Sequence, residues 1–80
     1  MTIGSKVVEH ATFPVALGPA IRRRREAEGL RREALGLAIG RTAQSVMLYE
    51  LGQVTPPLWV LGRIAAQLGC SVSDLLEDRP

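Results

Sequence analysis

Four glycines, at positions 29, 40, 52 and 69, constrain the fold of this chain more than any other feature. Glycine adopts the left-handed backbone conformation without steric cost, and it commonly follows the last residue of a helix. Between these glycines, apolar residues recur at spacings of three and four, which is the period of a helix with one buried face. The chain is therefore interpreted as a series of short helices. Its 80 residues allow one small domain, which buries roughly 60–65% of the unfolded surface.

Five helices are predicted, and their ranges are 19–28, 30–39, 42–51, 58–68 and 71–76. Gly18 can cap the first helix, with Pro19 at its first helical position. Thr42 is a suitable N-cap for the third helix. Ser71 and Asp74 have the spacing of a capping-box variant at the start of the fifth helix. These local signals predict where the helices begin.

The predicted helices have apolar faces. Leu35 and Ile39 share one side of the second helix, and Val46 and Tyr49 share one side of the third. The fourth helix has the longest apolar stripe, which comprises Leu58, Leu61, Ile64, Ala65 and Leu68. We expect these faces to meet in one core.

Residues 1–16 lack the helical period. Val7, Ala11 and Phe13 alternate weakly with other positions, as in a strand, until Pro14 interrupts the pattern. This segment is interpreted as an N-terminal arm that is flexible or strand-forming. One interpretation is a flexible arm without a specific role, and the alternative is an arm that pairs with a second subunit or reaches DNA through Lys6. The folded domain is expected at 17–80.

Positive charge is concentrated near the predicted first and second helices. The net charge is only +2, but six of the nine arginines lie between positions 22 and 32. Arginine forms bidentate contacts with phosphates and bases, so this cluster favours a nucleic-acid partner. A solvated helix face is the alternative.

Several function classes find no support in the sequence. Cys70 is the lone cysteine, which excludes an internal disulfide and a multi-cysteine zinc site. No catalytic arrangement is recognisable around His10, the only histidine, and Asp74, Glu77 and Asp78 are interpreted as a cap and a solvated tail. No apolar run approaches the roughly 18 residues of a membrane span, and no signal-peptide layout is present. We therefore expect a soluble cytoplasmic protein, not an enzyme, with no metal, cofactor, small-molecule substrate or membrane contact.

The middle of the chain meets the residue requirements of two helices packed across a tight turn. Leu35, Gly36, Ile39 and Gly40 supply, in order, an apolar residue, a small crossing residue, an apolar residue and the turn glycine. Together with IRRRREAEGL, IGRTAQSV, YELG and LGRIAAQLGCSVSDLL, this order resembles the lambda-repressor-like, Cro-type (XRE) helix-turn-helix family over residues 18–76. The resemblance implies an all-α, compact five-helix domain. It also implies a sequence-specific double-stranded DNA-binding transcriptional regulator, in particular a repressor.

Arg25 and Glu50 lie at inward or boundary positions of their helices, where an unpaired charge is costly. The resemblance implies that these two residues form a buried ion pair, which ties the first helix to the recognition helix. A surface pair is the alternative.

The chain departs from the family pattern near the expected DNA surface. Arg31 stands where a Ser or Thr cap is usual, Arg32 where Gln is common, and Arg41 where an apolar residue is common. Uncapped helix amides beside two guanidinium groups favour a DNA phosphate. The candidate phosphate contacts are Arg31, Arg32, Arg41, Thr42 and Gln53.

The predicted recognition helix, 42–51, is unusually apolar on its outward side. In the major groove, Gln44 is the candidate for a bidentate contact to adenine. Ala43, Met47 and Leu48 are the candidates for apolar contacts with thymine methyl groups.

The same apolar side supports a second hypothesis. With Leu37 and Trp59, it would form a protein-binding surface, as in an adaptor or an antitoxin that binds a protein partner. Strong salt-dependent binding to DNA favours the first hypothesis over this one.

A homodimer is expected because a domain of this size reads only a few base pairs. The candidate interface is the start of the fourth helix, at Leu58, Trp59 and Val60, and the arm at 7–13 is a second candidate. Packing of Trp59 under the arm is the alternative. We expect such a regulator to be associated with the nucleoid.

Overall fold

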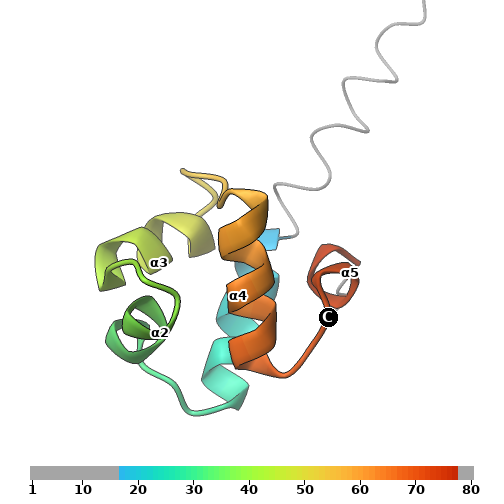
Figure 1. Ribbon diagram of the computed structural model, residues 1–80, viewed down its shortest axis with the longest axis horizontal. Helices are drawn as coiled ribbons and strands as arrows, with labels where there is room; N and C mark the ends of the chain where they lie inside the picture. The colour runs from blue at the N-terminus through green and yellow to red at the C-terminus, as the bar shows by residue number, and fades with distance from the viewer. Residues whose placement is uncertain (1–16, 78–80) are drawn as a thin grey trace, which may run out of the picture.

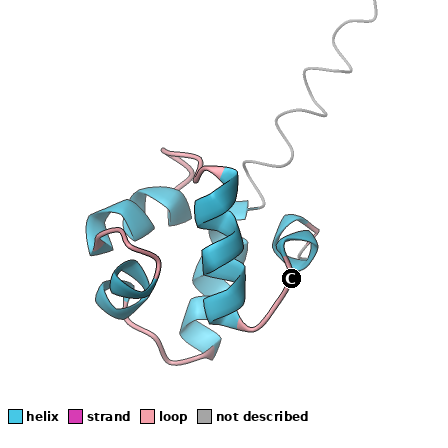
Figure 2. Ribbon diagram, viewed as in Figure 1, coloured by secondary structure: helices cyan, strands magenta, loops and turns pink. Residues whose placement is uncertain are grey.

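The computed structural model describes residues 17–77, which form five helices and no strand (Figures 1 and 2). The first helix covers 17–27, and the others are α2 (Arg32–Ala38), α3 (Ala43–Glu50), α4 (Leu58–Leu68) and α5 (Val72–Leu76). This architecture confirms the predicted all-α, five-helix fold. The predictions for the arm at 1–16, including Lys6 and His10, lie outside the described residues, as does Asp78.

The helix ends follow the predicted local chemistry. Each of the four glycines that follow a helix has a positive φ, between 71° and 74°. The Thr42 hydroxyl accepts a hydrogen bond from the Ser45 amide at 3.1 Å and caps α3. At α5, Ser71 and Asp74 form the full reciprocal capping box. By contrast, Arg31 precedes α2 with no side-chain cap.

The prediction for Gly18 is wrong, because residues 17–20 are already helical and Gly18 is buried within the first helix. A Cβ atom at Gly18 would lie 2.4 Å from the Glu50 carbonyl oxygen. Glycine is therefore required here for close packing against the end of α3, not for a helix cap. A cap signal and a close-packing glycine look identical in a single sequence.

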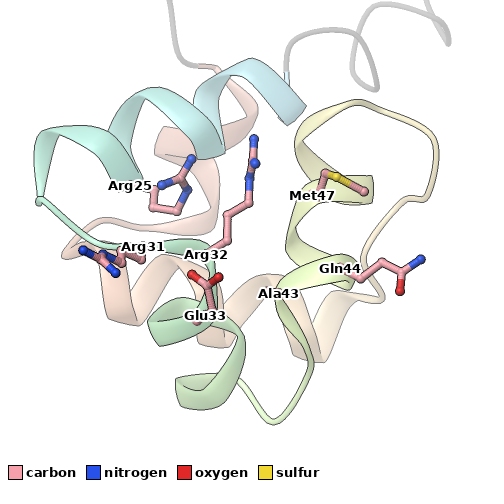
Figure 3. A pocket seen from close by; sticks show the side chains of 7 residues that line it. All are labelled: Arg25, Arg31, Arg32, Glu33, Ala43, Gln44 and Met47. Carbon is pink, nitrogen blue, oxygen red and sulfur yellow. The ribbon is translucent and has the colours of Figure 1, made fainter.

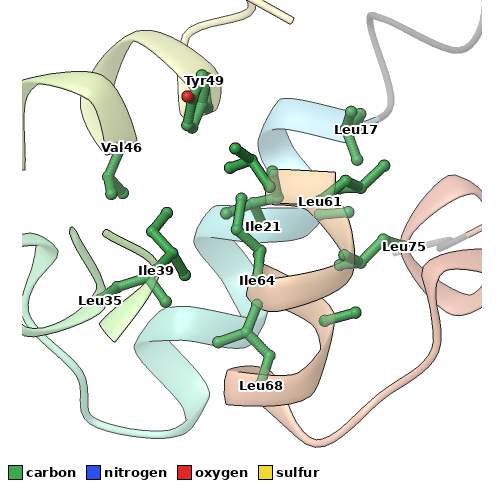
Figure 4. Packing of buried hydrophobic residues seen from close by; sticks show 13 residues of the cluster. Leu17, Ile21, Leu35, Ile39, Val46, Tyr49, Leu61, Ile64, Leu68 and Leu75 are labelled. Carbon is green, nitrogen blue, oxygen red and sulfur yellow. The ribbon is translucent and has the colours of Figure 1, made fainter. Parts of the chain in front are cut away.

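Thirteen apolar side chains form one core at the centre of the helices (Figure 4). All five helices contribute: Leu17, Ala20, Ile21, Leu35, Ile39, Val46, Tyr49, Val60, Leu61, Ile64, Ala65, Leu68 and Leu75. Cys70 is partly buried and packs against this core, as expected for a small apolar residue.

The core reverses two predictions for α4. The predicted inward stripe includes Leu58, but Leu58 is 75% exposed. Val60 was placed at a subunit interface, but it is fully buried and cannot present its side chain to a second copy. Leu58 is the first residue of α4 and lies at the edge of the buried face, so no other helix covers it. The buried face is centred one step further along, on Val60, Leu61 and Ile64.

The helices α2 and α3 pack closely across the turn between them. A Cβ atom at Gly36 would lie 2.6 Å from the Thr42 carbonyl carbon, so only glycine allows this approach. The Arg41 amide donates a 2.8 Å hydrogen bond to the Gly36 carbonyl and closes the turn. Gly36 therefore acts as the small crossing residue that the helix-turn-helix pattern requires. Among residues 17–77, no helix is long and apolar enough to span a lipid bilayer.

Candidate nucleic-acid interface

A surface hollow of about 430 Å³ lies between the N-terminal ends of α2 and α3 (Figure 3). Arg31, at the N-cap of α2, lines it together with Arg32 and Glu33 of α2. Ala43, Gln44 and Met47 line it from α3. Arg25 of the first helix also contributes. The hollow thus brings together candidate phosphate-binding and candidate base-reading side chains from two different helices.

The α3 side of the hollow offers one polar group among apolar ones. Gln44 is exposed in the first turn of α3, and its amide is free to donate and accept hydrogen bonds at a base edge. Ala43 and Met47 flank it and are each half-buried. Such a surface can form a bidentate contact with adenine and apolar contacts with thymine methyl groups.

The α2 side of the hollow is basic. Arg31 is exposed and extended, with φ −81° and ψ 157°, and the first amides of α2 receive no side-chain acceptor from it. Free helix-start amides favour an anion, and the adjacent guanidinium strengthens that preference. Glu33, which the sequence reasoning missed, also lines this side and is exposed. Its carboxylate opposes phosphate binding nearby.

Behind the hollow, Glu50 of α3 holds two arginines at once. Arg25 donates to the Glu50 carboxylate from Nε to Oε2 and from Nη2 to Oε1, the latter at 3.2 Å. Arg32 donates from Nε to Glu50 Oε1 at 3.0 Å. The side chains of Glu50 and Arg25 are 1% and 9% exposed, so the expected pair between the first helix and α3 is present and buried.

The hydrogen bonds of Arg25 extend beyond Glu50. Its Nη1 donates to the Leu30 carbonyl at 2.7 Å, which ties the loop before α2 to the same network. The hydrogen bond to Glu50 raises the pKa of Arg25 above its ordinary value, against the opposing effect of burial. Arg25 is therefore a fixed cation that joins the first helix, the following loop and α3.

Arg32 has a role that its sequence position did not predict. It was expected only to contact phosphate, but its Nε is bound to Glu50 and its side chain is 34% exposed. The terminal nitrogens of Arg32 make no hydrogen bond within the described part of the chain. The guanidinium is thus anchored on one edge while its other donors remain available.

The remaining candidate contacts lie outside the hollow. Arg41, in the α2–α3 turn, places its guanidinium carbon 4.9 Å from the centre of the Trp59 ring. Leu48 is half-buried further along α3, and Gln53 is exposed in the connection to α4. The Thr42 hydroxyl is already engaged with Ser45 through its amide and its hydroxyl. These residues neighbour the hollow in sequence but do not line it.

Arg63 is a second cation that the sequence reasoning missed. Its guanidinium carbon lies 5.1 Å from the centre of the Trp59 ring. Trp59 and Arg63 are four residues apart on α4, a spacing that places side chains on one helix face. In the sequence, this four-residue spacing was the signal that could have predicted the contact between Trp59 and Arg63.

A family model described as a helix-turn-helix domain matches residues 16–77 of the chain. The chain belongs to this helix-turn-helix family. Among solved structures, it is similar to the P22 c2 repressor protein, whose crystal structure was determined in complex with synthetic operator 9T in the presence of Tl⁺. The sequence identity is 28% and the TM-score 0.75, over 79% of this chain and 96% of the repressor chain. A search of curated proteins found no match.

These comparisons agree with the geometry of α2 and α3. The chain has the helix-turn-helix fold and is similar to an operator-bound repressor. Its family and its fold are those of DNA-binding regulators. The Cro-type resemblance seen in the sequence is confirmed. Within residues 17–77, no group of three or more His, Cys, Asp or Glu side chains is arranged to hold a metal ion.

Proposed function

We propose that this protein is a sequence-specific, double-stranded DNA-binding transcriptional repressor that inserts α3 into the major groove. One observation carries the proposal: the hollow between α2 and α3 joins the exposed Gln44 amide to the arginines at the start of α2. The P22 c2 repressor, which is similar over most of this chain, was crystallised with an operator. Residues 17–80 are taken as the DNA-binding unit and residues 1–16 as its arm.

Base recognition is assigned to the first two turns of α3. Gln44 is the polar reader, and Ala43, Met47 and Leu48 pack on thymine methyl groups. The burial of Val46 and Tyr49 on the opposite face of α3 supports this assignment, because it leaves these four side chains on the outward side.

Affinity is assigned to residues that flank the base readers. Arg31 and Arg32, with the uncapped amides of α2, bind one DNA backbone. Arg41, Thr42 and Gln53 contact phosphates near the two ends of α3. Arg32 is held by Glu50, so its free nitrogens are oriented before DNA arrives, which reduces the entropy lost on binding.

Selection of bound duplexes from a random DNA pool, followed by measurements on variants, tests the proposal. Gln44→Ala should cost about 1–3 kcal/mol on the selected site and relax preference at one base pair. Arg31→Gln should weaken all duplexes alike and reduce the salt slope by about one unit. Gln67→Ala, an exposed glutamine of α4, is the matched control and should change neither property. Failure of the wild-type protein to bind any duplex at low salt contradicts the proposal.

We also propose a homodimer with its interface near the connection between α3 and α4. Leu51, Val54 and Leu58 are apolar and 56%, 44% and 75% exposed, respectively, and Trp59 adjoins them. Several exposed apolar side chains within one short segment are typical of a contact surface. Light scattering at micromolar concentration should show a dimer for the wild type and a monomer for Leu58→Glu. A monomeric wild type, with and without DNA, contradicts the dimer.

The alternative proposal is a protein-interaction module, such as an adaptor or antitoxin, that uses the apolar side of α3. The observation that favours it is the exposure of Leu37, at 83%, on the same helix pair. The DNA selection decides between the two, because the adaptor should show no salt-dependent duplex binding. Under either proposal, the protein is cytoplasmic and not an enzyme, and it needs no cofactor. As a repressor, it acts at the nucleoid.

A further inference from the structure

Two arginine side chains lie against the aromatic ring of Trp59. The guanidinium carbons of Arg41 and Arg63 lie 4.9 Å and 5.1 Å from the ring centre, within the range of cation–π attraction. Arg41 comes from the α2–α3 turn, and Trp59 and Arg63 come from α4. Trp59 is 54% exposed, so this three-residue cluster lies at the surface.

Neither arginine of the cluster has a carboxylate partner among residues 17–77. Arg22, Arg25 and Arg32, in contrast, each form an ion pair within 4.0 Å. The distance between the guanidinium carbons of Arg41 and Arg63 cannot exceed the sum of their distances to the Trp59 ring centre. The structure thus places two like charges on one aromatic ring, and within residues 17–77 neither has a carboxylate partner.

Exposed cations without a carboxylate partner attract an external anion. Attraction to the Trp59 ring orients both guanidinium groups, but it does not neutralise their charge. Phosphate oxygens at this surface would neutralise that charge and accept charge-assisted hydrogen bonds from each arginine. Arginine forks match the oxygens of a phosphate in shape as well as in charge.

The cluster is anchored beside the start of the recognition helix. Arg63 Nη1 donates to the Ile39 carbonyl at the C-terminal end of α2, at 3.5 Å. The same nitrogen lies close to Gly40, 3.3 Å from the position that a Cβ atom would occupy there. Arg41 directly precedes Thr42, the N-cap of α3. A helix that enters the major groove with its N-terminal end brings the residue before its cap close to a DNA backbone.

We propose that Arg41, Trp59 and Arg63 form a phosphate clamp that binds the DNA backbone beside α3, with Trp59 positioning both arginines. Phosphates follow one strand at about 3.4 Å of rise each, so two nearby guanidinium groups can bind one phosphate or two successive ones. This inference rests on the proposed DNA-binding function. It adds Arg63 and Trp59 to the interface and gives the aromatic ring a role within its own chain.

Salt dependence of DNA binding and Trp59 fluorescence test the clamp. Arg63→Gln keeps a side-chain donor but removes the charge, so the slope of log affinity against log salt should fall by about 0.9 for any duplex. Arg63→Lys keeps the charge and should retain most of the slope. Arg22→Gln, an exposed arginine already paired with Glu26 at 3.1 Å, is the matched control and should leave the slope unchanged. Trp59 is the only tryptophan, and its emission should change in proportion to bound duplex.

The outcomes separate this inference from the function on which it rests. If duplexes bind but Arg63→Gln leaves the slope unchanged, or Arg22→Gln lowers it equally, the clamp is refuted and DNA binding stands. If Arg63→Gln does not fold, the Trp59 fluorescence of the wild-type protein is the deciding measurement. An emission that stays constant when the protein is saturated with duplex refutes the clamp. If the wild type binds no duplex at low salt, the proposed function itself fails.

Discussion

Glu50 is shared by two arginines, so we predict that losing both arginines destabilises the protein by more than the sum of the two single losses. In Arg25→Gln, Arg32 still donates to the carboxylate, and in Arg32→Gln, both Arg25 hydrogen bonds remain. Only the double variant leaves the Glu50 carboxylate, 1% exposed, without any cation.

The expected losses of unfolding free energy follow from how deeply each arginine is buried. Arg32 is 34% exposed, so its loss should cost about 0.5–1 kcal/mol, close to a surface pair. Replacing Arg25 also removes its hydrogen bond to the Leu30 carbonyl. The Arg25→Gln variant should therefore lose about 2–3 kcal/mol of unfolding free energy. Stranding a buried charge adds its own penalty, because breaking a buried pair costs about 3–5 kcal/mol. The double variant should therefore exceed the sum by at least about 1 kcal/mol, within the range measured for residues in one network.

Urea unfolding followed by far-UV circular dichroism measures these four free energies. Thermal midpoints give a second reading, because about 1 kcal/mol shifts a domain of this size by about 4–8 °C. Arg22→Gln, which breaks the exposed pair with Glu26, is the control and should cost less than about 0.5 kcal/mol. The shared-partner reasoning is refuted if the two single losses add within about 0.5 kcal/mol. It is also refuted if Arg32→Gln costs as much as Arg25→Gln.

Three further predictions concern helix packing and base reading. Gly18→Ala and Gly36→Ala place a Cβ atom within 3.0 Å of backbone atoms and should each cost about 1–3 kcal/mol of unfolding free energy. Gly62→Ala meets no atom within 4 Å and is the matched control; it should stabilise the protein by about 0.5–1 kcal/mol. Thr42→Ala removes the cap of α3 and should lower the unfolding free energy by about 1 kcal/mol, and no change in the urea midpoint would argue against this cap. Met47→Ala should weaken binding to the selected duplex less than Gln44→Ala does, and only where thymine is present; equal losses on thymine-free duplexes would contradict the methyl contact.

Part of the candidate site could be predicted because its signals are local or follow a family pattern. Thr42 caps α3 through an amide three residues away, and Gly40 ends its helix through its own backbone freedom. The spacing of Val46, Tyr49 and Glu50 identified the buried side of α3 and so left Gln44 outside. The pairing of Arg25 with Glu50 came from the family resemblance, which carries long-range information that spacing lacks.

The amino-acid sequence by itself determined where the helices end and which fold family they form, because caps, glycine stops and apolar periods act over a few residues. Only the tertiary structure decided which distant groups meet. The angle at which the first helix crosses α3 makes Gly18 a packing residue, and the rotation of α4 buries Val60 while exposing Leu58. The same packing places Arg32 on Glu50 and brings Arg41 to the Trp59 ring that also carries Arg63. These contacts depend on a rigid arrangement of whole helices, which local spacing does not encode.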